Sequence, residues 1–131
     1  MRILIAEDDF GSRRLLQSIL EEYGDCDTAV DGEEALEAFK LAWKEKRPYS
    51  LICLDIMMPK LNGQEVLKHI REFERLNGIK PADEVKIIMT TVLDDPKNVI
   101  DALYKGGASA YLVKPISKEK LLQELTELGL I

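Results

Sequence analysis

Ile3-Leu4-Ile5-Ala6-Glu7-Asp8-Asp9 is a run of four apolar residues that stops at three carboxylates. Three later apolar runs stop at polar residues in the same way: 51–54 at Asp55, 87–89 at Thr90-Thr91, and 111–113 at Lys114. Short continuous apolar runs are typical of strands that are covered on both faces. The four runs therefore predict buried strands of a parallel sheet.

Strands and amphipathic helices alternate along the whole chain. The strand patterns lie at 2–7, 26–30, 50–55, 86–91 and 109–113. Apolar residues at helical spacing, predicted to be core faces, are Leu15, Leu16, Ile19, Leu20 and Tyr23; Leu36, Phe39 and Trp43; Val66, Leu67, Ile70 and Phe73; Val99, Ile100 and Leu103; and Leu121, Leu122, Leu125 and Leu128. Such an alternation predicts an α/β fold of parallel βα units with right-handed crossovers and helices on both faces of the sheet.

Length and composition indicate one globular domain, which we expect to span residues 1–131. The 131 residues are 46% hydrophobic and 32% charged, with no low-complexity tract and no Gly/Ser-rich linker. The segment from Gly78 to Glu84 breaks the helical pattern, but it is too short to join two domains and is predicted to be a surface loop. The last helical pattern ends near the C-terminus, so we expect no output domain.

Charge and motif content exclude several classes of protein. The net charge of −6 argues against direct nucleic-acid binding, and no apolar stretch approaches the length of a membrane span or resembles a signal peptide. Cys53 lies inside an apolar run, which predicts a buried thiol and a reducing compartment. The chain has one histidine, His69, and no Gly-rich phosphate loop, which argues against zinc or nucleotide cofactors. We therefore predict a cytoplasmic protein.

The residues at the strand ends predict a metal and phosphoryl site. Carboxyl ends of parallel strands share one edge of the sheet, where open α/β sheets bind ligands. Carboxylates about 5 Å apart repel by roughly 3 kcal/mol, so a hard divalent cation is favoured there. We assign Asp8 and Asp55 as Mg²⁺ ligands, with Glu7 acting directly or through water. Asp55 is the predicted nucleophile toward phosphorus, and Lys114 together with a hydroxyl from the Thr90-Thr91 pair would hold the phosphoryl oxygens.

Each of these assignments has a simpler structural alternative. Acidic residues after a strand are often helix caps, and Asp9 can cap the first helix. Asp55 can act as a turn former, Thr91 as an ordinary strand residue, and Lys114 as a solvated lysine at a strand end. The functional interpretation rests on the convergence of the four sites rather than on any one of them.

The motifs Glu7-Asp8-Asp9, Asp55-Ile-Met-Met-Pro59 with Gly63, Thr91, and Tyr111-Leu-Val-Lys114-Pro115 together resemble the receiver domain of two-component response regulators. The resemblance covers essentially the whole chain. It implies a flavodoxin-like, doubly wound, five-stranded parallel sheet in the order 2-1-3-4-5. It also implies a signalling phosphoacceptor rather than an enzyme, with Asp55 accepting its phosphoryl group from a histidine kinase or phosphotransfer protein.

The resemblance also implies residue roles. It places the functional hydroxyl on Thr91 rather than Thr90, and it adds the backbone carbonyl of Met57 as a metal ligand. Thr91 and Tyr111 would form a switch that reshapes a protein-binding face, and the Lys114–Pro115 peptide bond would be cis. No other cofactor is implied.

Two segments depart from the commonest receiver pattern. The connection from Gly78 to Glu84 is longer than in the minimal fold, and residues 104–108 carry one more residue than usual. The positions two after Asp55 and two after Thr91 hold Met57 and Leu93, both apolar. We hypothesise that these side chains shield the phosphoryl group from water.

The sequence thus predicts a stand-alone receiver, similar to the chemotaxis type, that switches a protein-binding surface or relays its phosphate. Its partners would be the phosphodonor protein and a downstream protein target, and it would be a monomer or a phosphorylation-dependent dimer. Two alternatives stay open: a degenerate receiver that acts only as a docking module, and a Mg²⁺-dependent phosphohydrolase. The second usually needs another acid two residues after the nucleophile, where this chain has Met57.

Overall fold

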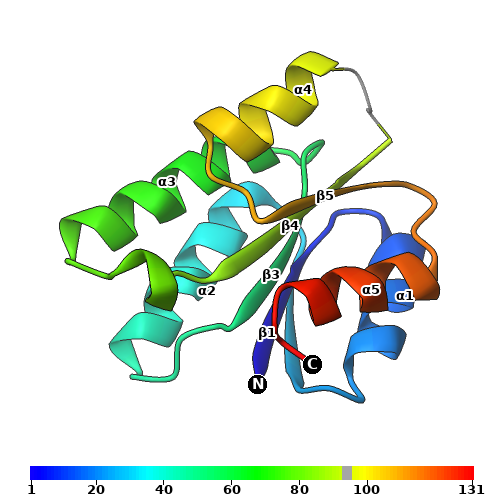
Figure 1. Ribbon diagram of the computed structural model, residues 1–131, viewed down its shortest axis with the longest axis horizontal. Helices are drawn as coiled ribbons and strands as arrows, with labels where there is room; N and C mark the ends of the chain where they lie inside the picture. The colour runs from blue at the N-terminus through cyan, green and yellow to red at the C-terminus, as the bar shows by residue number, and fades with distance from the viewer. Residues whose placement is uncertain (93–95) are drawn as a thin grey trace.

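A computed structural model of the protein describes residues 1–92 and 96–131. The strands are β1 (Arg2–Ala6), β2 (Asp25–Ala29), β3 (Leu51–Asp55), β4 (Lys86–Thr91) and β5 (Ala110–Val113). The helices are α1 (Phe10–Leu20), α2 (Gly32–Lys44), α3 (Gly63–Leu76), α4 (Pro96–Ile100) and α5 (Lys118–Glu127) (Figure 1). A 3₁₀ turn, η1 (Pro81–Asp83), follows α3, and a π-helical turn, η2 (Asp101–Lys105), continues α4.

The strands form one parallel sheet in the order β2-β1-β3-β4-β5. The chain starts at β1, adds β2 on one side as the edge strand, and then crosses β1 to add β3, β4 and β5 on the other side. This reversal next to β1 creates the crevice in which doubly wound sheets place their ligands. The flavodoxin-like architecture predicted from the sequence is confirmed.

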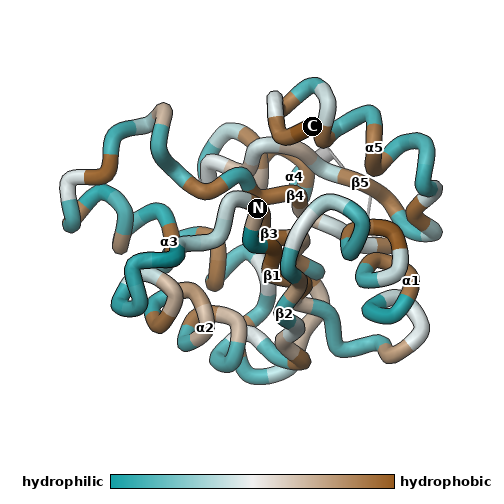
Figure 2. Tube along the Cα trace, turned by 90° about the horizontal axis from the view of Figure 1, so that it is seen from below, coloured by the Kyte–Doolittle hydropathy of each residue, from teal (hydrophilic) through white to brown (hydrophobic). Residues whose placement is uncertain are grey.

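Alternation of side chains along the buried strands makes two apolar layers. Leu4, Ile52 and Ile87 face the layer that contains the apolar side chains of α2 and α3, whereas Ile3 and Ile88 face α1 and α5. In Figure 1 the two helix pairs lie on opposite sides of the sheet, and Figure 2 shows the apolar strands between them. Because β1, β3 and β4 are buried on both faces, their sequences are continuous apolar runs.

Helix caps fix the chain where it leaves the sheet. Asp9, Asp31 and Asn62 each accept a hydrogen bond from a backbone N–H in the first turn of α1, α2 and α3, at 2.8 to 2.9 Å. Asn62 and Glu65 form a reciprocal capping box. The helix-cap interpretation of Asp9 is therefore confirmed, and these caps hold the loops at the carboxyl edge of the sheet in place.

Gly63 lies against the backbone of β3. Its N–H donates to the Ile56 carbonyl at 2.8 Å, and a Cβ at this position would lie 2.3 Å from the carbonyl oxygen of Asp55. Only glycine allows so close an approach. The start of α3 is thereby packed directly against the strand end that carries Asp55.

Two predicted core residues lie at the surface. Leu15 of α1 and Ile100 of α4 are both exposed. Each helix buries a narrower stripe than the periodicity indicated: α1 buries Leu16, Ile19 and Leu20, and the residue buried in the turn after α4 is Ala102. Apolar residues at the edge of a helical stripe are covered only if a neighbouring element reaches them.

The two segments that depart from the receiver pattern have defined structures. In η2 the Gly106 N–H donates to the Asp101 carbonyl at 2.7 Å, a π-type hydrogen bond that takes up one more residue than an α-turn. After α3, buried Glu74 accepts hydrogen bonds from Arg71 at 2.6 Å and from the Val85 N–H at 2.8 Å. The segment from 78 to 84, predicted as a loop, thus contains η1 and is fastened to α3 at its end.

No helix within the described residues is long and apolar enough to cross a membrane.

Candidate functional site

Three strand ends bring the predicted site residues to one edge of the sheet. Backbone hydrogen bonds continue past the strands, from the Glu7 N–H to Ala29, from Ile56 to Thr90 and from Lys114 to Thr91, at 2.7 to 3.0 Å. These bonds hold the residues just beyond β1, β3 and β5 in register. Glu7, Asp55 and Lys114 meet although 107 positions separate the first from the last.

The carboxylates form a tight cluster. Glu7, Asp8 and Asp55 each offer an oxygen atom, and these oxygens all lie within 4.8 Å of one another. Glu7 has no exposed surface and Asp55 is 3% exposed, whereas Asp8 is open to solvent. Two carboxylates of the cluster are therefore buried and the third faces solvent, so an ion can enter from the side of Asp8.

Lys114 supplies the positive charge within the cluster. Its ammonium group forms a salt bridge with Glu7 and lies 3.5 Å from Oδ1 of Asp55, with 15% of its side chain exposed. One ammonium group balances only part of the charge of three carboxylates. Hard oxygen ligands with surplus negative charge suit Mg²⁺, so the donor set present fits this ion.

The two buried carboxyl groups differ in acidity. Burial, together with the hydrogen bond and the charge of Glu7, raises the pKa of Asp55 to about 7. Burial also opposes ionisation of Glu7, but hydrogen bonds from Asp55 and Lys114 hold the pKa of Glu7 below its ordinary value. Glu7 is therefore the stronger acid of the pair, and Asp55 takes up its proton at a higher pH than an ordinary aspartate does.

The raised pKa of Asp55 makes the affinity of the site for Mg²⁺ depend on pH. Below pH 7 a cation must displace the proton on Asp55, so we expect the affinity to fall about tenfold for each pH unit below 7 and to level off above it. Isothermal titration with MgCl₂ in buffers of different ionisation enthalpy would measure both the affinity and the proton released. Equal affinity at about pH 6 and about pH 8 would contradict this assignment.

The two threonines of β4 lie on opposite faces. Thr90 is the register partner of Asp55, whereas Thr91 pairs with Val113, beside Lys114. Both are buried. Among the described residues, the hydroxyl of Thr90 is a buried polar atom without a hydrogen-bond partner. Alternation along β4 and β5 places Thr91 on the same face as Tyr111, which packs against the core layer of α2 and α3.

The other predicted positions lie around the rim. Met57 is 59% exposed, and its N–H donates to Oδ1 of Asp55 at 3.4 Å. Leu93 lies outside the described residues. The Lys114–Pro115 peptide bond is cis, as the resemblance implied.

Arg13 is a member of the site that the sequence analysis did not identify. Its guanidinium group donates to the Glu7 carbonyl at 2.9 Å and lies over the ring of Phe10, 5.5 Å from the centroid. The sequence feature that could have identified Arg13 is its position one helical turn after the N-cap residue Asp9. From there a long side chain reaches back to the end of the strand. Arg13 thus fastens the start of α1 to the loop that carries the acidic residues.

A groove of about 290 Å³ borders the cluster between α1 and the segment after β5. Its lining residues are Asp9, Gly11, Ser12, Leu15, Leu16, Lys114, Pro115 and Ile116. The groove places exposed Leu15 beside the lysine that contacts the buried carboxylates. An apolar partner surface can therefore reach the rim of the site.

Structural comparison finds the same fold in solved proteins. The protein is similar to a chain in the crystal structure of the CheX-CheY-BeF₃-Mg²⁺ complex from Borrelia burgdorferi, with a TM-score of 0.84, 30% identity, and coverage of 98% of this chain and 89% of that chain. It is also similar to a chain in the co-crystal structure of the Saccharomyces cerevisiae histidine phosphotransfer signaling protein Ypd1 and the receiver domain of its downstream response regulator Ssk1. There the TM-score is 0.83, the identity 31%, and the coverage 98% of this chain and 88% of that chain.

Sequence comparison points to the same family. Among curated proteins, the chain is 38% identical over 121 residues to the probable transcriptional regulator ycf27 of Cyanophora paradoxa. The match covers 92% of this chain but 44% of that protein, so the chain spans less than half the length of this relative. A family model described as the response regulator receiver domain matches residues 3–126. The chain belongs to the response regulator receiver domain family of two-component signal transduction.

Proposed function

We propose that the protein accepts a phosphoryl group on Asp55, with Mg²⁺ bound beside it, from a histidine kinase or a histidine phosphotransfer protein. The observation that carries this proposal is the cluster of Glu7, Asp8 and Asp55 oxygens within 4.8 Å of one another, with Lys114 in contact. Membership of the receiver family supports the same chemistry. The stand-alone organisation, the extent of the domain over 1–131 and the cytoplasmic location stay predictions.

The residues present can hold the metal ion. Asp8 and Asp55 would be carboxylate ligands, Glu7 would act directly or through water, and the Met57 carbonyl would complete the protein ligands. When bound, Mg²⁺ supplies positive charge that offsets the charge on the transferring phosphoryl oxygens. In its deprotonated form Asp55 would offer the carboxylate oxygen that acts as the nucleophile.

The transfer itself exchanges one bond to phosphorus for another. An oxygen of Asp55 attacks the phosphorus atom in line, and the bond from phosphorus to the donor histidine nitrogen breaks. That nitrogen keeps the bonding electron pair and takes up a proton, so the products are an aspartyl phosphate and a neutral histidine. The ammonium group of Lys114 and the hydroxyl of Thr91 would then hold the phosphoryl oxygens.

The groove beside Lys114 is the place where we expect the phosphodonor protein to dock. It carries exposed Leu15 next to the site, and Phe10 is exposed at the start of the same helix. The similarity to the structure containing Ypd1 and the Ssk1 receiver supports a protein donor of the histidine phosphotransfer type. A partner seated there would exclude water while its phosphohistidine reaches Asp55.

The output of phosphorylation would be a changed protein-binding surface. Thr91 and Tyr111 lie on one face of neighbouring strands, so movement of the hydroxyl toward a phosphoryl group would open space for the aromatic ring. The downstream partner would be a protein that recognises this altered face, or a second copy of the receiver. A chain that only relays phosphate would bind its acceptor at the donor groove instead.

The direct test is incubation with acetyl phosphate and MgCl₂, followed by intact-mass measurement. We expect one phosphoryl group per chain, and none when the metal is chelated. Absence of incorporation together with failure to bind Mg²⁺ would favour the docking-module alternative. Repeated turnover of a phosphomonoester would favour the phosphohydrolase.

Met57 is expected to slow the loss of the phosphoryl group. Its exposed apolar side chain, two residues after Asp55, has no hydrogen-bond donor and offers an attacking water molecule only a weak sulfur acceptor. Replacing Met57 with asparagine supplies a donor and an acceptor at the rim, and we expect the half-life of the aspartyl phosphate to shorten several-fold. Decay of the radiolabelled protein after removal of the donor measures this. A variant whose phosphate lasts as long as that of the wild type would show that Met57 gives no protection.

A further inference from the structure

A second groove lies between the C-terminal ends of α2 and α3, away from the carboxylate cluster. It has a volume of about 440 Å³, and its lining residues are Lys40, Trp43, Lys44, Phe73, Asn77 and Ile79. Helices of parallel βα units end near the edge of the sheet at which the next strand begins. This groove is therefore at the opposite edge from Asp55, and α2 and α3 lie side by side in Figures 1 and 2.

The charge of this α2–α3 groove is positive in a chain whose net charge is −6. The lining includes two lysines and no carboxylate. Both lysines are exposed, and neither forms a salt bridge with a described residue. Lys40 and Lys44 are one helical turn apart, so their ammonium groups can act on the same anion.

The wall of the groove includes two aromatic residues, Trp43 and Phe73. Phe73 is held edge-on against buried Phe39, with ring centroids 5.4 Å apart. The indole N–H of Trp43 is buried and has no acceptor among the described residues. A buried donor without a partner is destabilising, and each such group in a folded protein calls for an explanation. Because this nitrogen is covered, a ligand acceptor seated between the two helices would satisfy it once the Trp43 side chain turns toward the groove.

The remaining wall comes from the long connection after α3, which departs from the commonest receiver pattern. The Asn77 amide donates to the Phe73 carbonyl at 2.8 Å, and the Ile79 N–H donates to the Glu74 carbonyl at 3.0 Å. Gly78 between them has a φ of +67°, which turns the chain back across the helix end. The phosphoacceptor chemistry does not use this segment, yet its residues complete the groove.

We propose that the α2–α3 groove binds a small anion that carries an aromatic ring, a nucleoside monophosphate or an aromatic carboxylate. The ring would lie against Trp43 and Phe73, and the anionic group would lie between the two lysines. An oxygen or ring nitrogen of the ligand would accept from the Trp43 indole. The volume is within the range of small-ligand pockets, roughly 300 to 1,000 Å³.

Trp43 is the only tryptophan, so a ¹⁵N-labelled sample gives one indole N–H resonance that reports on this groove. Titration with adenosine monophosphate and, separately, with benzoate distinguishes the two sources of the anion. We expect at least one of them to move the indole resonance saturably, and adenosine and inorganic phosphate to move it at least about tenfold more weakly. No saturable movement with either anion up to about 10 mM would overturn the proposal.

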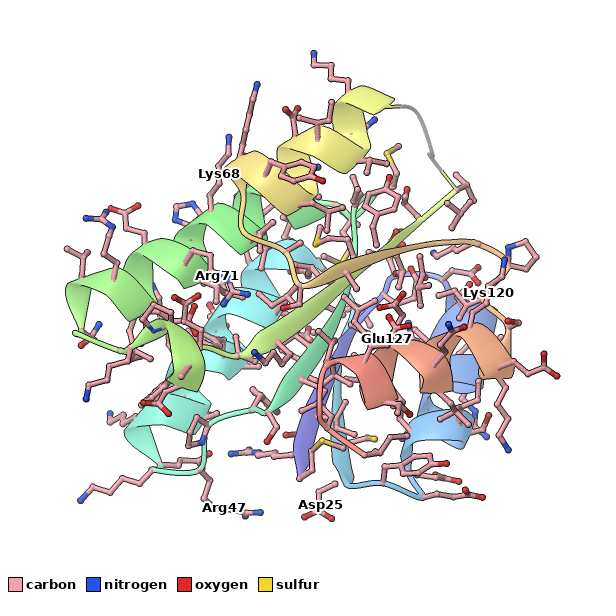
Figure 3. The ribbon with its side chains drawn as sticks, in the orientation of Figure 1. Asp25, Arg47, Lys68, Arg71, Lys120 and Glu127 are labelled. Atoms are coloured by element: carbon pink, nitrogen blue, oxygen red, sulfur yellow. The ribbon has the colours of Figure 1, made fainter. Side chains whose placement is uncertain are left out.

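Charge-removing variants provide the second arm of the test. The double variant Lys40→Ala, Lys44→Ala should weaken binding of the anion at least about tenfold. Lys120→Ala, on α5 on the opposite side of the sheet (Figure 3), should leave it unchanged. Equal affinity of the double variant and the wild type would refute the site. Acetyl phosphate labelling of the double variant should match the wild type, so the outcome is independent of the chemistry at Asp55.

Discussion

Replacing Asp55 with alanine should abolish phosphoryl incorporation from acetyl phosphate or a kinase. We do not expect the other carboxylates of the cluster to substitute, because Glu7 is fully buried in contact with Lys114 and Asp8, which is exposed, would be engaged as a ligand of the proposed metal ion. Loss of one charge from a cluster of three should also weaken Mg²⁺ binding. Intact-mass spectra with and without MgCl₂ measure the first effect, and calorimetric titration measures the second.

Asp9→Asn is the matched control for this prediction. Asparagine caps helices as well as aspartate does, and Asp9 serves α1 through its hydrogen bond from the Ser12 N–H. This variant removes a nearby carboxylate without changing the cluster, so it should still be phosphorylated. Phosphate retained by Asp55→Ala, or lost from Asp9→Asn alone, would show that the phosphoacceptor is misassigned.

Replacing Lys114 with alanine should destabilise the metal-free protein by about 3 kcal/mol near pH 8. The substitution leaves Glu7, which has no exposed surface, and Asp55, which is 3% exposed, without their counter-charge. Breaking a buried ion pair by removing one partner costs more than the intact pair contributes, because a buried charge is left uncompensated. Mg²⁺ can replace the missing charge, so saturating metal should restore much of the loss.

Urea unfolding with and without MgCl₂ measures this effect on the free energy of unfolding. Lys105→Ala is the control, because that lysine is 73% exposed and forms only a surface pair with Asp101 at 3.4 Å. Its removal should change the stability by less than about 0.5 kcal/mol in either condition. If Lys114→Ala behaves like Lys105→Ala, the lysine does not neutralise the cluster in solution.

The sheet and the convergence of its strand ends were predictable because both depend on local features of the sequence. Asp55 ends a fully buried strand, and Lys114 follows an apolar run that proved only partly buried, since Val113 is exposed. In a parallel sheet all such runs end at the same edge. No knowledge of side-chain positions was needed to expect these residues together. The order of the strands, in contrast, came from the resemblance, since alternation alone allows several orders.

Helix faces were predicted less well, for two different reasons. Leu15 lies at the edge of the apolar stripe of α1 and lines the groove that this helix forms with the segment after β5, and helical periodicity carries no information on that segment. Ile100 is the last residue of α4, and in the π-helical turn that follows, which simple α-helical periodicity does not anticipate, Ala102 is the buried residue. In both cases a distant or irregular element decides burial.

Depth and side-chain reach within the site could not be predicted from the sequence. Glu7 and Asp8 are adjacent acids, yet one is fully buried and the other exposed, because β1 turns only one of them toward the interior. Arg13 enters the site only through its long side chain. The burial of the Trp43 indole N–H, which has no hydrogen-bond partner among the described residues, likewise depends on tertiary packing, which the pattern of a single helix does not encode.

A crystal structure of the protein grown with MgCl₂ and beryllofluoride would test the central claim most directly, since that adduct mimics an aspartyl phosphate. We expect the adduct on Asp55, Mg²⁺ bound by oxygens of Asp8 and Asp55, and Lys114 in contact with the adduct. A structure with the beryllofluoride absent or on another residue, and no metal among the three carboxylates, would contradict the account.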